Sequence, residues 1–164
     1  MSLRTLALGV AAALAAAACN RPPALANSYA TPEALAASVM DALAARDRER
    51  LDAIALSERE FRDHVWPELP AAKPERNLPF SFVWRDLRQK SRAALSQTLK
   101  EHGERRYHVE RVTFAANTRY ASYTVHREAT VHVRDALNST RAMRVCGSMF
   151  EKQGRWKVFS YVVD

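Results

Sequence analysis

The chain has 164 residues, with 25 lysines and arginines against 18 acidic residues, and a formal net charge of +7. This length fits one domain that is large enough for a real core. The basic residues alternate with acids, as in "RDRER" and "SEREFRD", and form no block of like charge. No nucleic-acid partner is therefore expected, whereas attraction to anionic lipid or to an anionic ligand stays open.

The first residues have the pattern of an export signal. One positive charge, Arg4, precedes thirteen apolar or small residues from Leu6 to Ala18. A charged start followed by an apolar run of this length is typical of a secretory signal peptide. The run is shorter than the roughly 20 apolar residues that a transmembrane helix needs. We predict that residues 1–18 are a signal peptide and leave them out of the fold.

Two cleavage sites are consistent with this signal. Residues 16–19, "AAAC", resemble a bacterial lipobox, with Ala16 at a position where leucine is favoured. Residues 24–26, "ALA", match the ordinary signal peptidase pattern, and cleavage there would leave Asn27 first. We favour the lipobox, because a cysteine directly after the apolar run is hard to explain otherwise. Acylation of Cys19 would hold the protein firmly in a membrane.

These features predict a lipoprotein of the cell envelope, exported, membrane-anchored and facing the periplasm. Asn20 follows the cysteine in place of the aspartate that resembles an inner-membrane retention signal, which favours an outer membrane where the host has one. Once Cys19 carries lipid, Cys146 has no intramolecular disulfide partner. Cys146 lies in an apolar run and is interpreted as a small buried hydrophobe.

A tether and three helices are expected next. Residues 19–30 contain two prolines without periodicity and are predicted to be a tether. A single α+β domain is predicted over residues 31–164. It begins with a helix from residue 31, where a threonine precedes a proline and a glutamate. A short helix is predicted over residues 47–55, and a capping box at residues 57–60 precedes a third.

A proline-rich connection and a long helix follow. Four prolines in residues 66–79 exclude a continuous helix or a central strand. The long helix is predicted over residues 81–102, with Trp84 in its buried stripe and Gly103 as its C-cap.

The rest of the chain has strand patterns. Alternation of polar and apolar residues is clearest over residues 119–135. Asn117 and Gly154 are predicted turn positions, and Gly147 is a predicted bend. Because the last strand is apolar on both faces, it is predicted to lie centrally in the sheet. The four predicted strands are residues 105–115, 119–135, 140–151 and 156–163. The predicted class is α+β, with N-terminal helices packed on one face of a strongly bent antiparallel sheet.

The order of elements, together with the hairpin "GRWKV" at residues 154–158, resembles the nuclear transport factor two-like superfamily, a cystatin-like cone. The resemblance covers residues 31–164 and implies a cavity between the bent sheet and the long helix. The superfamily includes isomerases, dehydratases, epoxide hydrolases and polyketide cyclases, and also pocket-bearing proteins without chemistry. The resemblance therefore implies where a site lies and implies no reaction.

Arg127 is the most informative of the residues expected at that cavity, because it stands in register with apolar neighbours. It could bind an anionic or polar ligand, with Tyr123 as its hydrogen-bond partner. Alternatively, a bulge near Glu128 turns Arg127 outward, or its side chain reaches the rim, and we favour this second interpretation. The full set of ligand-binding candidates is Trp84, Tyr123, Arg127, Met143, Val145 and Met149.

No acid–base pair joins these residues, so no catalytic residue is assigned. His126 and His132 lie about 20 Å apart on an extended strand, too far to share a metal ion, and no cofactor motif occurs, so neither a metal nor a cofactor is expected. We predict a ligand-binding or accessory domain without catalysis, for a small apolar or anionic ligand. A small hydrolase, isomerase or cyclase of the same fold and an envelope scaffold protein are the alternatives. A homo-oligomer is left open.

Overall fold

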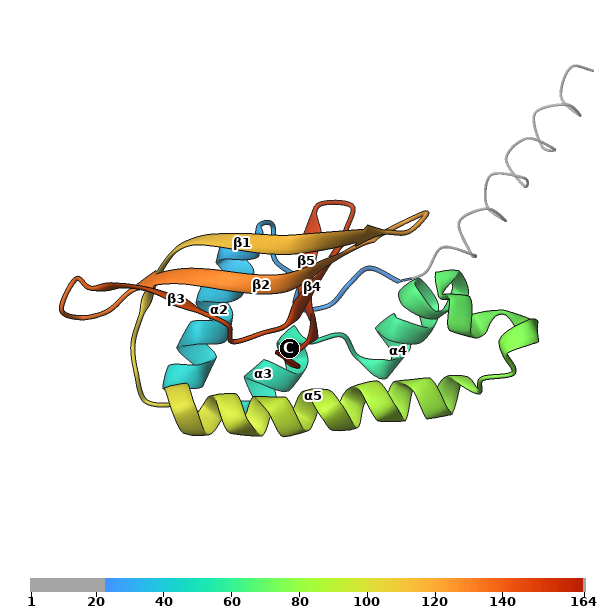
Figure 1. Ribbon diagram of the computed structural model, residues 1–164, viewed down its shortest axis with the longest axis horizontal. Helices are drawn as coiled ribbons and strands as arrows, with labels where there is room; N and C mark the ends of the chain where they lie inside the picture. Colours follow the sequence, from blue (N-terminus) through green and yellow to red (C-terminus); the bar gives the residue numbers. More distant parts are fainter. Residues whose placement is uncertain (1–22, 164) are drawn as a thin grey trace, which may run out of the picture.

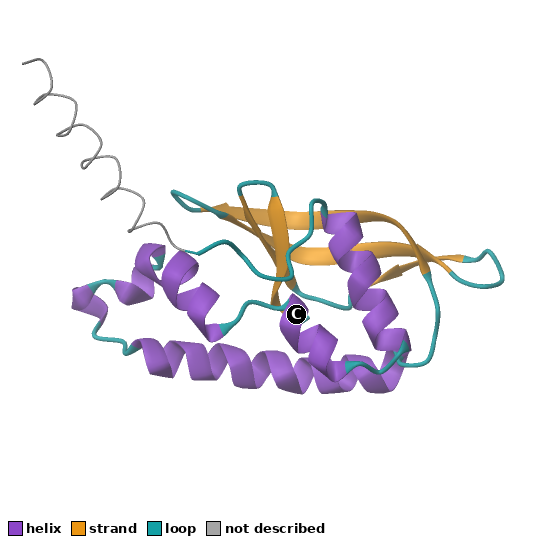
Figure 2. Cartoon of the chain, turned by 180° about the vertical axis from the view of Figure 1, so that it is seen from behind, coloured by secondary structure: helices purple, strands orange, loops and turns teal. Residues whose placement is uncertain are grey.

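The computed structural model describes residues 23–163, which form an α+β domain with four α-helices followed by a five-stranded antiparallel sheet. In Figure 1 the long helix α5 (Phe80–His102) runs along one side of the molecule, opposite the strands β1 and β2. Helix α2 (Pro32–Ala44) crosses from the sheet toward α5, beside the short helix α3 (Arg48–Ile54). Figure 2, from behind, again shows these helices on one side of the strands. The predicted α+β class, with helices before strands, is confirmed.

Helix α2 begins where the sequence predicts. The Thr31 hydroxyl accepts a hydrogen bond from the Ala34 amide at 3.1 Å, and Pro32 occupies the first helical position. A side-chain acceptor at this position satisfies one of the free amides of the first turn, and proline needs no partner there. Asp47 caps α3 in the same way, through the amide of Arg50 at 2.9 Å.

A chain of short helical turns links α3 to α5. Ser57 and Glu60 form the predicted capping box at the start of α4 (Glu58–Glu60), which continues into a π-helical turn over Phe61–Val65. Three 3-10 turns follow, and a proline stands at the first or second position of each one, where its missing amide costs nothing. These turns span Trp66–Glu68, Pro70–Ala72 and Pro74–Arg76.

Strand β2 (Thr124–Arg134) is the centre of the sheet. It pairs along one edge with β1 (His108–Arg119). Its other edge pairs with β3 (Thr140–Met143) and then, further along, with β4 (Ser148–Lys152), which pairs with β5 (Arg155–Ser160). The third predicted strand is therefore two strands, β3 and β4.

Gly147 lies in the interruption between β3 and β4, as predicted. A Cβ atom at this residue would fall 1.4 Å from the carbonyl oxygen of Val162, so no other residue fits without moving the backbone. The Gly147 amide donates to Ser160 at 3.0 Å, and its carbonyl accepts from Ala129 at 3.2 Å. These contacts hold the end of the chain tightly against the break in the strand.

Two strand predictions are wrong. The turn between β1 and β2 lies at Tyr120–Tyr123, closed by a 2.9 Å bond from the Tyr120 amide, and Asn117 is paired within β1. Strand β5 lies at an edge of the sheet instead of its centre. Its free edge is nevertheless covered in part, because Tyr29 and Ala55 form bridges along it.

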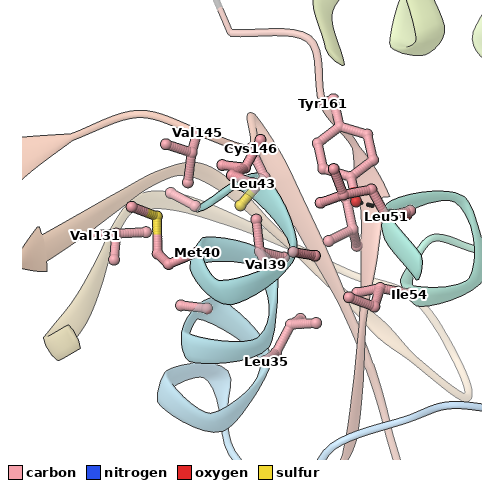
Figure 3. Packing of buried hydrophobic residues seen from close by; sticks show 14 of the residues in the cluster. Leu35, Val39, Met40, Leu43, Leu51, Ile54, Val131, Val145, Cys146 and Tyr161 are labelled. Atoms are coloured by element: carbon pink, nitrogen blue, oxygen red, sulfur yellow. Dashed lines mark hydrogen bonds between the residues drawn. The ribbon is translucent and has the colours of Figure 1, made fainter. Parts of the chain in front are cut away.

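The interior has two hydrophobic clusters. The larger, which we call the α2 cluster, packs α2 and α3 against the sheet, and Figure 3 shows part of it. Within it, the Tyr161 hydroxyl donates to the carbonyl of Leu51 at 2.7 Å. The second, which we call the Phe61 cluster, lies under the short turns and the start of α5; its buried members are Leu56, Phe61, Val65, Tyr123, Val125 and Phe150.

Residues 23–30, the described part of the predicted tether, lie against the domain. The Tyr29 amide and carbonyl pair with Trp156 of β5 at 3.0 and 2.8 Å. The carbonyl of Ala26 accepts from the Lys157 ammonium at 2.7 Å. This segment is thus part of the folded unit.

Candidate functional site

A cavity of about 330 Å³ lies where β2 changes its partner from β4 to β3. Strand residues, the bend at Gly147 and the end of the chain form its walls. The lining residues are Thr118, Tyr120, Val125, Arg127, Glu128, Arg144, Gly147, Ser148, Phe159, Ser160 and Val162.

The local backbone explains why the sheet is open here. Glu128 has a positive φ of 54°, a left-handed conformation that side chains other than glycine adopt only rarely. Opposite it, residues 144–147 belong to no strand, so the edge of β2 that faces β3 and β4 lacks a regular partner at this point. The two irregularities coincide, and the cavity occupies the gap between the ends of β3 and β4.

The charged groups of the cavity are two guanidinium groups and one carboxylate. Arg127 is exposed, and one-third of the Arg144 side chain is exposed. The nearest nitrogen of Arg144 lies 3.9 Å from the Glu128 carboxylate, which offsets part of the positive charge. The planar guanidinium group matches carboxylate and phosphate groups through paired hydrogen bonds. This arrangement suits a small anion.

The remaining walls combine hydroxyl and apolar groups. Tyr120 and Ser148 contribute hydroxyls, whereas Val125, Phe159 and Val162 contribute apolar surface. A cavity with apolar walls and a few polar groups is the usual form of a small-molecule site.

The structure brings only one of the predicted pocket residues, Arg127, to this cavity. Tyr123 is buried in the Phe61 cluster, where its hydroxyl donates to the carbonyl of Val65 at 3.3 Å. Burial raises the pKa of Tyr123, and the nearby Tyr120 and Glu68 add to this effect. The Tyr120 ring stacks on Tyr123 at 4.5 Å and lines the cavity in its place.

The other four candidates lie elsewhere. Trp84 packs against the Phe61 ring at 5.3 Å and borders a separate surface hollow on α5. Three candidates are buried in the α2 cluster and line neither this cavity nor the hollow on α5: Met143, Val145 and Met149. The expected register was right in marking these strand positions as inward-facing, but the interior there is filled by side chains.

Sequence reasoning missed Tyr120, Arg144 and Ser148. The signal that could have found two of them is Gly147, because residues beside a strand break are freed from regular pairing and can line a gap. Tyr120 could not be found in this way, because its turn was predicted at Asn117.

Cys146 is fully buried, and burial raises the pKa of its thiol to about 12. The thiolate that would make it reactive is therefore disfavoured at neutral pH. Cys19 and the predicted signal lie outside the described residues.

Within residues 23–163, no three or more histidine, cysteine, aspartate or glutamate side chains are grouped so that they could hold a metal ion. None of the helices there has the length and apolar character needed to cross a membrane.

Comparisons with protein-family models, with curated proteins and with solved structures found no match for this chain.

Proposed function

We propose that this protein is an exported, lipid-anchored domain that binds a small anionic ligand and catalyses no reaction. The observation that carries the proposal is the cavity at the break between β3 and β4, with Arg127 and Arg144 among its lining residues. Hydroxyl and apolar groups beside them suit a ligand with one anionic end and an apolar part.

The cellular address is part of the same proposal. The apolar run followed by "AAAC" supports lipid attachment at Cys19, which would anchor the domain to a membrane on its periplasmic side. Two attached acyl chains suffice for stable anchoring.

We also propose that the fold is of the nuclear transport factor two-like type, with a strongly bent sheet. The order of helices, long helix and antiparallel strands supports this proposal. The interruption of the sheet at Gly147, and the steep crossing of β4 and β5 beneath β1 and β2 in Figure 1, are consistent with a bend there.

The test is the intact mass of the protein extracted from its own membranes in mild detergent, measured under native conditions. We expect a chain that begins at Cys19 with acyl chains, together with a small co-purified anion. The Arg127→Ala variant should lose the co-purified mass and keep the acyl chains. Arg106→Ala is the matched control, since Arg106 is an exposed arginine away from the cavity, and it should keep both. A chain that carries no ligand, or one retained in Arg127→Ala, would overturn the binding proposal.

A further inference from the structure

The residues just after the proposed lipid site are held at fixed positions on the domain. The Pro23 carbonyl accepts from His64 at 2.9 Å, and the Ala26 amide donates to the Glu60 carboxylate at 2.9 Å. Further along, the Ser28 hydroxyl accepts from Arg155 at 3.0 Å. Successive contacts of this kind leave the segment from Pro23 onward no freedom to act as a spacer.

A buried ion pair anchors the middle of this segment. The Lys157 ammonium lies 2.9 Å from the Glu60 carboxylate, and the two side chains are 2% and 9% exposed. Each partner also bonds the backbone of Ala26, one to its amide and one to its carbonyl. Buried charges need such partners, so the position of Ala26 is tightly specified.

The short distance to Cys19 then limits how far the domain can lie from a membrane. Only three residues separate Cys19 from Pro23. An extended chain spans at most about 3.5 Å per residue, so Cys19 lies within about 14 Å of Pro23. If Cys19 carries lipid, as the proposed function holds, the end of the domain nearest Pro23 must lie against the bilayer.

That end of the molecule carries exposed apolar side chains. In Figures 1 and 2 the described chain begins beside the short turns that lead into α5, at one end of the molecule. Leu78 and Phe82, just before and within the first turn of α5, are 41% and 59% exposed. Lys73 and Arg76, on the preceding turns, are also exposed and outnumber the neighbouring Glu75.

We propose that Lys73, Arg76, Leu78 and Phe82, which we call the Leu78–Phe82 surface, rest on the bilayer to which Cys19 is anchored. Apolar side chains of this kind enter the boundary between headgroups and acyl chains, and basic residues beside them are attracted to anionic lipid. The inference rests on the proposed lipid anchor, and it adds an orientation that the anchor alone does not define. The domain is held at the membrane surface with the first turn of α5 toward the lipid.

The opposite end of the molecule supplies a control. Leu137 is 87% exposed, more than either apolar residue of the Leu78–Phe82 surface. It lies in the turn between β2 and β3, which Figures 1 and 2 place at the end of the molecule away from the short turns. Exposure alone would favour Leu137 for lipid contact, whereas the proposed orientation keeps it in water.

The experiment places an environment-sensitive fluorophore on a cysteine introduced by Phe82→Cys or, as the control, by Leu137→Cys. Cys146 is buried with a raised pKa, so the dye reacts with the introduced cysteine once Cys19 carries lipid. The acylated protein is reconstituted in vesicles of phosphatidylethanolamine and phosphatidylglycerol whose acyl chains are brominated. We expect quenching of the fluorophore at position 82 and none at position 137.

The outcomes separate this inference from the proposed function. Acyl chains in the intact mass, with equal or absent quenching at the two positions, would overturn the orientation and leave the anchor standing. A mass without acyl chains would overturn both. A fluorescence change at position 82 that depends on protein concentration in detergent would show that a second copy covers this surface, which also contradicts the proposal.

A separate variant tests whether Leu78 and Phe82 themselves contact the lipid. With the fluorophore at Lys73→Cys, the double change Leu78→Asp with Phe82→Asp should abolish quenching by brominated lipid. Leu137→Asp should leave the quenching unchanged. Retained quenching in the double variant would contradict the proposed contact, because the anchor alone would then hold this end at the membrane.

Discussion

The two clusters of the interior are built in different ways. The α2 cluster joins helices and sheet mainly through aliphatic side chains such as Leu35, Val39 and Leu43. At the edge of the Phe61 cluster, by contrast, the Glu60 carboxylate and the Lys157 ammonium are buried together. Glu60 directly precedes Phe61, and Lys157 is the strand partner of Phe150.

The two clusters therefore have different roles: one stabilises the fold, and the other fixes the position of a backbone segment. Apolar burial is non-directional and tolerates several packings, so the α2 cluster stabilises the fold without specifying where one backbone segment lies. A buried ion pair gains little net stability but penalises every arrangement that leaves a charge unpaired. Here the pair binds the backbone of Ala26, so its consequence is a defined place for the residues that follow the proposed anchor.

Lys157→Met is expected to have the largest effect. It leaves the Glu60 carboxylate buried without its cation, and breaking a buried pair in this way costs about 3–5 kcal/mol. Urea denaturation measures the free energy of unfolding. Hydrogen exchange should also rise at the peptide covering residues 23–30, because the carbonyl of Ala26 loses its donor.

The control for this variant is a surface ion pair of similar length. Arg62 lies 2.8 Å from Glu58, and both side chains are more than half exposed. Arg62→Met should cost about 1 kcal/mol or less, because water screens such pairs and the cation–π contact of the half-exposed Arg62 with the Phe80 ring is weak. Similar losses from Arg62→Met and Lys157→Met would show that burial of the second pair has no special weight.

Leu43→Ala tests the other cluster. Leu43 is fully buried, and removing such a side chain costs about 2–5 kcal/mol through lost burial and the cavity left behind. Urea denaturation should show this loss, while exchange in residues 23–30 rises no more than in the rest of the domain. A selective rise in residues 23–30 would contradict the division between the two clusters.

Local chemistry made the helix starts predictable from sequence. Thr31 with Pro32, and Ser57 with Glu60, use side chains that bond amides a few residues away, so both partners are visible in one short stretch. The long helix was predicted over residues 81–102 and is found at Phe80–His102. It has no side-chain cap at its start, but its apolar periodicity and the glycine that follows it, Gly103, are visible in the sequence.

Contacts between distant residues explain the failures. The β1–β2 turn contains no glycine or proline, and the Glu68 carboxylate, 54 residues away, accepts hydrogen bonds from the Ser122 amide and hydroxyl. No local sequence pattern predicts such a turn. Likewise, Tyr29 and Ala55 form bridges along the free edge of β5. Sequence reasoning took this partly covered edge strand for a central one.

The same distinction between local and distant contacts explains which site residues could be predicted. Arg127 was found from strand register, and the alternative of an outward turn near Glu128 agrees with its exposure and with the positive φ of Glu128. The ion pair of Glu60 with Lys157 was not predicted, because the capping box already explained a glutamate at this position. Only the fold shows that one carboxylate serves the Ser57 cap, the Lys157 ammonium and the Ala26 amide together.

The smallest effect is expected on the pH dependence of stability. Burial alone would raise the pKa of Glu60, but hydrogen bonds from Ser57 and the charge of Lys157 hold it below its ordinary value of 4.5. The two influences on the pKa of Glu60 therefore oppose each other. Burial lowers the pKa of Lys157 from its ordinary value of 10.5, and the hydrogen bond and charge of Glu60 oppose part of that effect.

A lowered carboxyl pKa stabilises the folded state at pH values above the ordinary value, and this stabilisation is lost as the pH falls through the folded pKa. Urea denaturation between neutral pH and about pH 3 should therefore show a decline to which Glu60 contributes. Glu60→Gln should flatten that decline, although it lowers stability at neutral pH by leaving Lys157 unpaired. Glu58→Gln, which alters only the exposed pair with Arg62, should keep the decline of the unaltered protein. The same pH profile in both variants would show that Glu60 contributes no more to the loss of stability in acid than a surface carboxylate does. The contrast between the two clusters would then rest on geometry alone.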